Sequence, residues 1–96
     1  MKAILMFYNA AIESMVINCM KECRLESYTK FPGIHGAGKS AGPRLDTHVW
    51  PGVNNGLFIV TGEENVSSMM EKIRELKEKH PKEGVKAFLL PVEAEV

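Results

Sequence analysis

One short stretch of the sequence has the spacing of a phosphate-binding loop. Gly33 is followed by four residues and then by Gly38-Lys39-Ser40, which fits the pattern G-x-x-x-x-G-K-[ST]. Such a loop binds phosphate because its turn leads into a helix, whose first N–H groups point at the anion. Here Gly42-Pro43 follows and disfavours a sustained helix. We therefore expect no P-loop hydrolase, and at most a phosphate contact from the Gly36-Ala37-Gly38 backbone and the charge of Lys39.

Two histidines suggest a second chemistry for the same region. His35 and His48 flank a turn-rich segment, residues 36–53. If the flanking segments pair as a hairpin, the two imidazoles approach each other with Asp46 nearby, and a third ligand would complete a transition-metal site. The alternative is two separate surface histidines, because no tight spacing links them. A metal site with His35 and His48 as ligands is therefore one hypothesis.

The second half of this segment also suggests a contact surface. The run RLDTHVWPG, residues 44–52, holds Arg44, Asp46 and Trp50 together with His48. A tryptophan in a loop often marks a partner or ligand contact. Trp50 could instead cover the core of a neighbouring subunit. Arg44, Asp46 and Trp50 are our candidates for a partner-binding loop.

The two cysteines are better explained by packing than by chemistry. Cys19 and Cys23 are four residues apart on one expected helix and could share a soft metal ion. The same stripe also holds Met15 and Val16, which favours a role in the core. We find no Ser-His-Asp arrangement, paired carboxylates or acidic metal cage, so the sequence does not indicate an enzyme.

The composition is that of an ordinary globular protein. The chain has 96 residues, of which 45% are hydrophobic and 25% charged, which predicts one domain over residues 1–96. Its 12 basic residues balance its 12 acidic ones, so we expect no broad attraction to nucleic acid. No apolar run is long enough to span a membrane, and we see no signal-peptide pattern. With only two cysteines, we expect a cytoplasmic protein.

The hydrophobic pattern predicts four strands and two helices in the order β-α-β-β-α-β. The expected strands cover residues 2–8, 27–35, 56–61 and 85–93, and the expected helices cover residues 10–23 and 63–80. Pro32-Gly33 in the second strand indicates a sheet edge or a bulge. This order is the ferredoxin-like α+β fold, an antiparallel sheet with two helices on one face.

The strands also predict self-association. The runs AILMFY, GLFIV and AFLL are apolar on both faces and do not alternate. Two helices cover only one face of such a sheet, and the other would be a large exposed apolar patch. We therefore expect a homo-oligomer in which the open sheet faces pack together.

This layout and two short motifs resemble the PII-like signalling proteins, relatives of the nitrogen regulatory PII family. Gly36-Ala37-Gly38-Lys39 is similar to the G-x-G with a basic residue that ends the family's second strand, before its long T-loop. The stretch from Gly84 through Lys86 to Glu93 is similar to the family's B-loop lysine and following strand. Ser40 replaces the family's glutamine, and residues 39–53 form a shorter loop without tyrosine, so the resemblance is to a divergent member.

The resemblance implies a homotrimer that binds an adenine nucleotide, such as ATP, ADP or AMP, in clefts between subunits. It implies that Gly36, Gly38, Lys39, Gly84 and Lys86 contact the nucleotide. It further implies that residues 39–53 regulate a partner protein, which the sequence does not identify. The main alternative is a trimeric metal-binding or metal-tolerance protein that uses the two flanking histidines. A third hypothesis is a subunit-interaction module without a small ligand.

Overall fold

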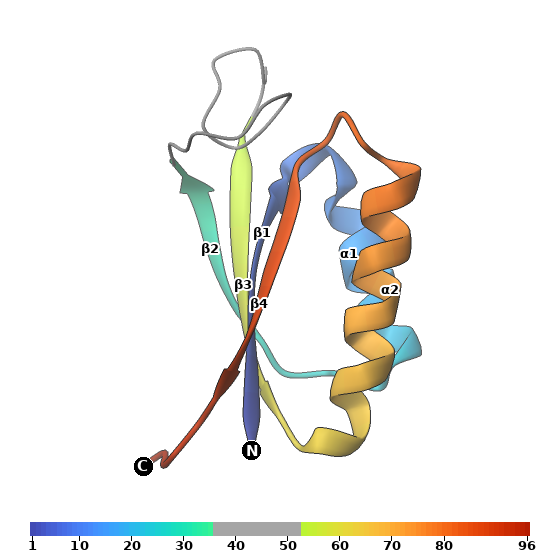
Figure 1. Cartoon of the computed structure of the whole chain (residues 1–96). Coiled ribbons are helices and arrows are strands. Elements are labelled where there is room, and N and C mark those ends of the chain that lie inside the picture. Colours follow the sequence, from blue (N-terminus) through green and yellow to red (C-terminus); the bar gives the residue numbers. More distant parts are fainter. Residues whose placement is uncertain (36–52) are drawn as a thin grey trace.

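The computed structural model describes residues 1–35 and 53–96 of the chain. The strands and helices follow the predicted order, β-α-β-β-α-β (Figure 1). They are β1 (Lys2–Asn9), α1 (Glu13–Glu22), β2 (Thr29–Ile34), β3 (Asn54–Thr61), α2 (Val66–Lys79) and β4 (Val85–Pro91). A short 3₁₀ helix precedes each α-helix, at Ala10–Ile12 and at Glu63–Asn65.

The four strands form one antiparallel sheet in the order β2-β3-β1-β4, and both helices lie on the same face of it (Figure 1). This is the ferredoxin-like arrangement that the sequence predicts. Long apolar strands occupy the centre, β1 and β3, where backbone groups pair on both sides. β2, which contains Pro32, lies at an edge, where the missing N–H of proline is tolerated.

Local sequence signals explain where the first helix begins and ends. The Asn9 side chain accepts a hydrogen bond from the Ala11 N–H at 2.9 Å and so starts the helical segment. After α1, Arg24 adopts a left-handed backbone conformation, with φ of 59°, which stops the helix. The predicted start at residue 10 is therefore right for the whole helical segment, although its first turn is 3₁₀.

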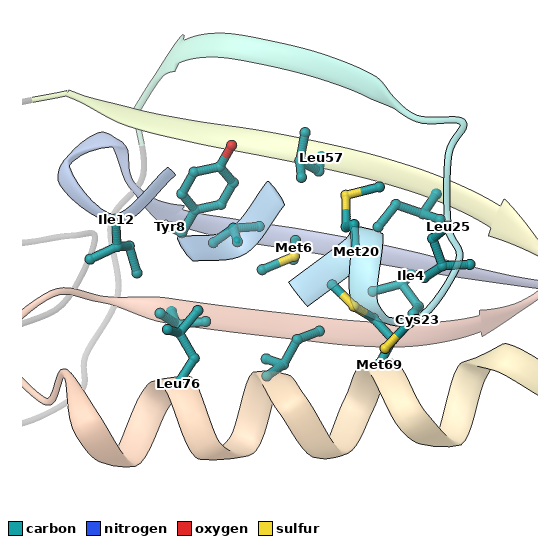
Figure 2. Close-up of a cluster of buried hydrophobic side chains, with 14 residues drawn as sticks. Ile4, Met6, Tyr8, Ile12, Met20, Cys23, Leu25, Leu57, Met69 and Leu76 are labelled. Atoms are coloured by element: carbon teal, nitrogen blue, oxygen red, sulfur yellow. The ribbon is translucent and has the colours of Figure 1, made fainter. Parts of the chain in front are cut away.

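The hydrophobic core fills the space between the helices and one face of the sheet (Figure 2). Its fully buried side chains include those of Ile4, Met6, Tyr8, Val16, Met20, Leu57, Ile59 and Met69. One predicted core residue is wrong, because Met15 is 41% exposed. The buried stripe of α1 consists of Val16 and Met20, and the buried Cys23 directly follows the helix. Met15 is adjacent to Val16 in the sequence and therefore lies on a different side of the helix.

Neither α1 nor α2 lies over the opposite face of the sheet (Figure 1), and this face carries a second set of large apolar side chains. Leu5 and Phe58 face each other on this side, and Phe7 packs edge-on against Phe88 with ring centroids 6.5 Å apart. Phe31, Phe88 and Leu90 are 43%, 45% and 39% exposed. We call this surface the open face. It is apolar, as the sequence predicts.

No helix in the described part of the chain is long and apolar enough to cross a membrane.

Candidate functional site

At one end of the sheet, the chain leaves and re-enters the strands on either side of two connecting segments, residues 36–52 and residues 80–84. β2 ends at this edge and His35 follows it, while Val53 leads back into β3 (Figure 1). The Ala10 N–H donates to the Val53 carbonyl at 2.7 Å, and the Asn9 N–H donates to the Gly84 carbonyl at 3.1 Å. The end of β1 is thus bonded through its backbone to the residues at which both segments rejoin the sheet. We call this region the loop end of the sheet.

Three of the residues singled out in the sequence lie at this loop end. Gly84 immediately precedes β4, and its carbonyl is the acceptor for Asn9. Lys86 is exposed and pairs with Phe7, so it lies at the rim of the open face. His35 is exposed directly after β2. The remaining candidates lie outside the described residues: Gly36, Gly38, Lys39, Arg44, Asp46, His48 and Trp50.

The first glycine of the phosphate-loop pattern belongs to the sheet. Gly33 is part of β2, with φ of 64°, and its N–H donates to Asn55 Oδ1 at 3.1 Å. A backbone N–H that is already bonded within the protein is not free to bind a phosphate. The rest of the pattern, residues 36–40, lies outside the described residues.

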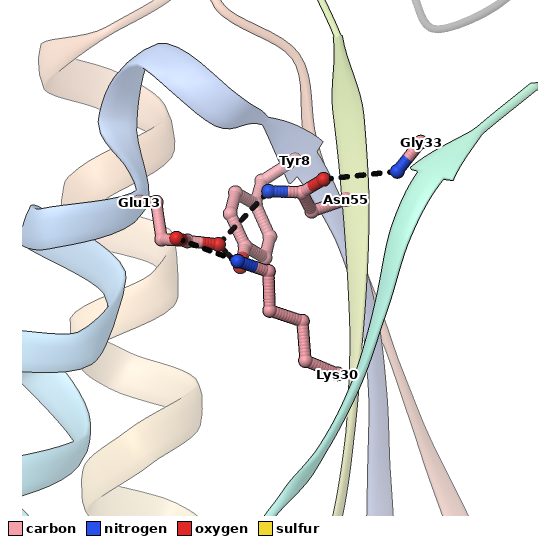
Figure 3. Close-up of polar contacts among 5 residues, drawn as sticks. All are labelled: Tyr8, Glu13, Lys30, Gly33 and Asn55. Carbon is pink, nitrogen blue, oxygen red and sulfur yellow. Dashed lines mark hydrogen bonds and ion pairs between the residues drawn. The ribbon is translucent and has the colours of Figure 1, made fainter.

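A polar network lies on the helix side of the same sheet end, and the sequence did not reveal it (Figure 3). The Glu13 carboxylate accepts three hydrogen bonds. Tyr8 Oη donates to Oε1 at 2.7 Å, and Asn55 Nδ2 donates to the same oxygen at 2.8 Å. Lys30 Nζ donates to Oε2 at 2.9 Å and forms an ion pair with it.

The network is electrostatically matched. Lys30 and then Tyr8 hold the pKa of the Glu13 carboxyl below its ordinary value, because both stabilise the charged form. Burial, followed by the hydrogen bond to Glu13, raises the pKa of the Tyr8 phenol. Tyr8 therefore stays a neutral donor and Glu13 stays a charged acceptor. Since both are engaged with each other, neither is poised as a nucleophile or base.

A sequence signal for the network did exist. Tyr8 and Asn55 are polar residues on the buried faces of the two central strands, where each needs a hydrogen-bond partner. What the sequence alone does not reveal is the partner, because Glu13 and Asn55 are 42 residues apart.

The described residues contain no group of three His, Cys, Asp or Glu side chains that could hold a metal ion. Cys23 is buried and Cys19 is half-buried, and burial raises the pKa of both thiols, which disfavours the thiolate form that binds metal. Both side chains pack in or against the core, as the sequence indicates. The pairing of His35 with His48 involves a position outside the described residues.

No protein-family model matches the chain, and no curated protein matches it in sequence. Solved structures match it well in fold. The apo form of CPII, a nitrogen regulatory PII-like protein from Thiomonas intermedia K12, aligns with a TM-score of 0.68 and 15% identity, over 95% of this chain and 89% of that one. The same protein bound to ADP, AMP and acetate aligns with a TM-score of 0.70 and 15% identity, over 97% and 88%.

A putative PII-like signalling protein from Thermus thermophilus aligns with a TM-score of 0.66 and 22% identity, over 92% of this chain and 82% of that one. The three alignments cover at least 92% of this chain and at least 82% of each matched chain. The chain therefore has the fold of the PII-like nitrogen regulatory proteins.

Proposed function

We propose that the chain is a divergent PII-like regulatory protein that binds an adenine nucleotide in clefts between the subunits of a homotrimer. The observation that carries this proposal is the loop end of the sheet. There, Gly84 and Lys86 lie at the same end of the sheet as the end of β2, from which residues 36–39 continue, but β4 and β2 are opposite edges of the sheet. The same fold holds ADP and AMP in CPII. We propose no catalytic activity for the chain.

The chemistry of these residues suits a phosphate group. Lys86 supplies an exposed positive charge, and Lys39 adds another. Gly36, Gly38 and Gly84 have no side chain to obstruct a close approach of backbone N–H groups to an anion. The site as proposed needs both segments, which explains why neither motif alone is a complete binding loop.

The open face supplies the argument for self-association, and the number of three subunits follows from the resemblance to the PII-like proteins. Phe31, Phe88 and Leu90 expose large apolar areas on a surface that neither α1 nor α2 covers. Burying such area contributes about 25 cal/mol per Å², and the partner with a matching surface is another copy of the chain. Because Lys86 lies at the rim of this face, a neighbouring copy packed there would form one wall of the nucleotide cleft.

Isothermal titration calorimetry with ATP, ADP and AMP tests nucleotide binding. We expect the wild type to bind, and Lys86→Ala and Lys39→Ala to weaken binding by about tenfold or more, as expected for the loss of a charged hydrogen bond. Lys77→Ala is the matched control, because Lys77 is exposed on α2, on the helix side of the sheet. Absence of binding by the wild type at millimolar nucleotide would refute the proposal.

Regulation of a partner through residues 39–53 is the second part of the proposal. Trp50 is the only tryptophan of the chain, so its fluorescence reports on this segment without labelling. We expect ADP to change the emission of the wild type and of Lys77→Ala at similar concentrations, and Lys86→Ala to need about tenfold more ADP or higher for the same change. An emission spectrum that is identical with and without bound ADP would count against a role of this segment in reporting nucleotide occupancy.

The metal hypothesis is tested on the same protein. If the chain binds only a nucleotide, titration with copper, nickel or zinc should give the same result for the wild type and for His48→Ala. Metal binding that is lost in both His35→Ala and His48→Ala would instead establish the metal site, and it would leave the nucleotide titration to be judged by itself.

A further inference from the structure

The edge strand β2 contains one residue more than its partner requires. Phe31 pairs with Gly56, and Ile34 pairs with Asn54, so three steps along β2 face two steps along β3. This is a β-bulge, and it contains Pro32-Gly33. Bulges bend a strand and redirect the side chains that follow.

The bulge decides which face of the sheet Ile34 occupies. As paired, Ile34 lies on the open face, and its Cδ1 would be 3.6 Å from a Cβ added to Gly56. If β2 continued from Phe31 without the extra residue, Gly33 would pair with Asn54 instead. Ile34 would then point to the helix face, because side chains alternate along a strand.

The polar network holds β2 on both sides of this irregularity (Figure 3). Before Pro32, Lys30 Nζ binds Glu13 at 2.9 Å. After Pro32, the Gly33 N–H binds Asn55 Oδ1 at 3.1 Å, and Asn55 Nδ2 binds Glu13 at 2.8 Å. Both attachments lead to the same carboxylate on α1.

Asn55 is the link that no other residue of the network replaces. It is 5% exposed on the buried face of β3, and it is the only member with both a donor and an acceptor in use. Its amide reaches the Gly33 N–H, which lies within the bulge and has no strand carbonyl opposite it in the register. Without Asn55, this N–H would be left to water, or the strand would shift to find a carbonyl.

We infer that Asn55 is a positioning residue that fixes the bulged register of β2, because its Oδ1 accepts from the Gly33 N–H while its Nδ2 donates to Glu13. The register determines where the chain leaves the sheet at His35. An effect of this register on nucleotide binding rests on the proposed function, because the proposed nucleotide site includes residues after His35. The inference about register stands on the geometry alone.

The test compares Asn55→Leu and Asn55→Ala with Asn54→Ala. Leucine has the branching and approximate size of asparagine, so Asn55→Leu removes both hydrogen bonds and keeps the packing. It therefore serves as the test variant if Asn55→Ala does not fold. Asn54 is the adjacent residue of the same type on the opposite face, and its Oδ1 has no hydrogen-bond partner among the described residues. Two NMR readouts follow β2: hydrogen exchange of the Gly33 amide, and the nuclear Overhauser effect between the Ile34 δ1 methyl and the Gly56 Hα.

In Asn55→Leu we expect the Ile34–Gly56 contact to disappear and Gly33 exchange to rise about tenfold or more. We expect both signals to be retained in Asn54→Ala. Retention of both signals in Asn55→Leu would overturn the inference. If Asn55→Leu only destabilises the whole fold, amide exchange will accelerate across the core, and the folded molecules will keep the Ile34–Gly56 contact. That outcome would also contradict the inference.

Calorimetry with ADP then separates this inference from the proposed function. A wild type that binds ADP and an Asn55→Leu variant with at least about tenfold lower affinity would support both. If the wild type does not bind ADP, the proposed function fails, and the NMR result still decides the register. If Asn55→Leu changes register and binds ADP like the wild type, the link between register and site is wrong.

Discussion

The two faces of the sheet contain similar apolar side chains and have different surroundings. On the helix face, Leu57 and its neighbours are fully buried, and the polar groups of Tyr8 and Asn55 are bonded to Glu13. On the open face, Phe88 and Leu90 remain exposed. The comparison indicates that the helix face provides the stability of the subunit, while the open face is left exposed, and we propose that further copies of the chain cover it.

The largest expected effect is on the helix face. Leu57→Ala removes a fully buried side chain and leaves a cavity, so we expect it to lower the free energy of unfolding by about 2–5 kcal/mol. Chemical denaturation measures this. The matched variant is Val60→Ala on the same strand and the open face, where the side chain is only partly buried. Equal losses for the two variants would contradict the difference between the faces.

The second effect concerns assembly. Phe88→Glu places a charge on the open face, and we expect it to weaken association by at least about 1.5–3 kcal/mol per subunit, the contribution of burying a phenylalanine. Met15→Glu is the control, because Met15 is exposed to a similar extent on α1. Light scattering over a dilution series measures the mass. A wild type that is monomeric at every concentration would show that the open face is not a subunit interface.

A smaller effect is expected at the bulge of β2. Gly33 has φ of 64°, and no atom lies within 4 Å of a Cβ added there, so Gly33→Ala tests the backbone conformation without a steric clash. We expect a loss of about 1–2 kcal/mol in the free energy of unfolding. Gly33→Asn should lose less, because asparagine tolerates the left-handed region better. If alanine and asparagine are both as stable as glycine, Gly33 is not needed for the bulge.

The smallest effect is the pH dependence of the network. The pKa of Glu13 lies below its ordinary value of 4.5 in the folded chain, so ionised Glu13 contributes stability above that value. The contribution is lost as the pH falls through the lowered pKa. We therefore expect the wild type to be more stable than Glu13→Gln at neutral pH, and the difference to shrink in acid.

Urea denaturation over a pH series measures this difference. Glu78→Gln serves as the control, because Glu78 is exposed and forms no ion pair among the described residues. A difference between wild type and Glu13→Gln that is constant from neutral to acid pH would mean that the charge of Glu13 contributes no stability.

Much of the fold could be predicted because its signals are local. The helical spacing of Val16 and Met20 marks the buried stripe of α1, and Asn9 caps its first turn. Pro32-Gly33 indicated an edge strand or a bulge, and β2 is an edge strand that contains a bulge. The prediction that Met15 belongs to the core was wrong. Its neighbour Val16 lies at the centre of the buried stripe, and a hydrophobic pattern does not determine how wide the buried face of a helix is.

The candidate site was predictable only in part. The positions of Gly84 and Lys86 at one sheet end with His35 follow from the strand order. Their role in nucleotide binding remains a prediction, as do the roles of Gly36, Gly38 and Lys39.

The sequence by itself determined the order of elements, the ends of the helices and the apolar character of both sheet faces, because each depends on neighbouring residues. Only the tertiary structure decided which distant polar groups meet. Glu13 is joined to Lys30 and to Asn55 because α1 crosses the sheet beside β2 and β3. The same holds for the direction in which the chain leaves β2. It depends on a hydrogen bond between residues 22 positions apart, and no local pattern encodes that contact.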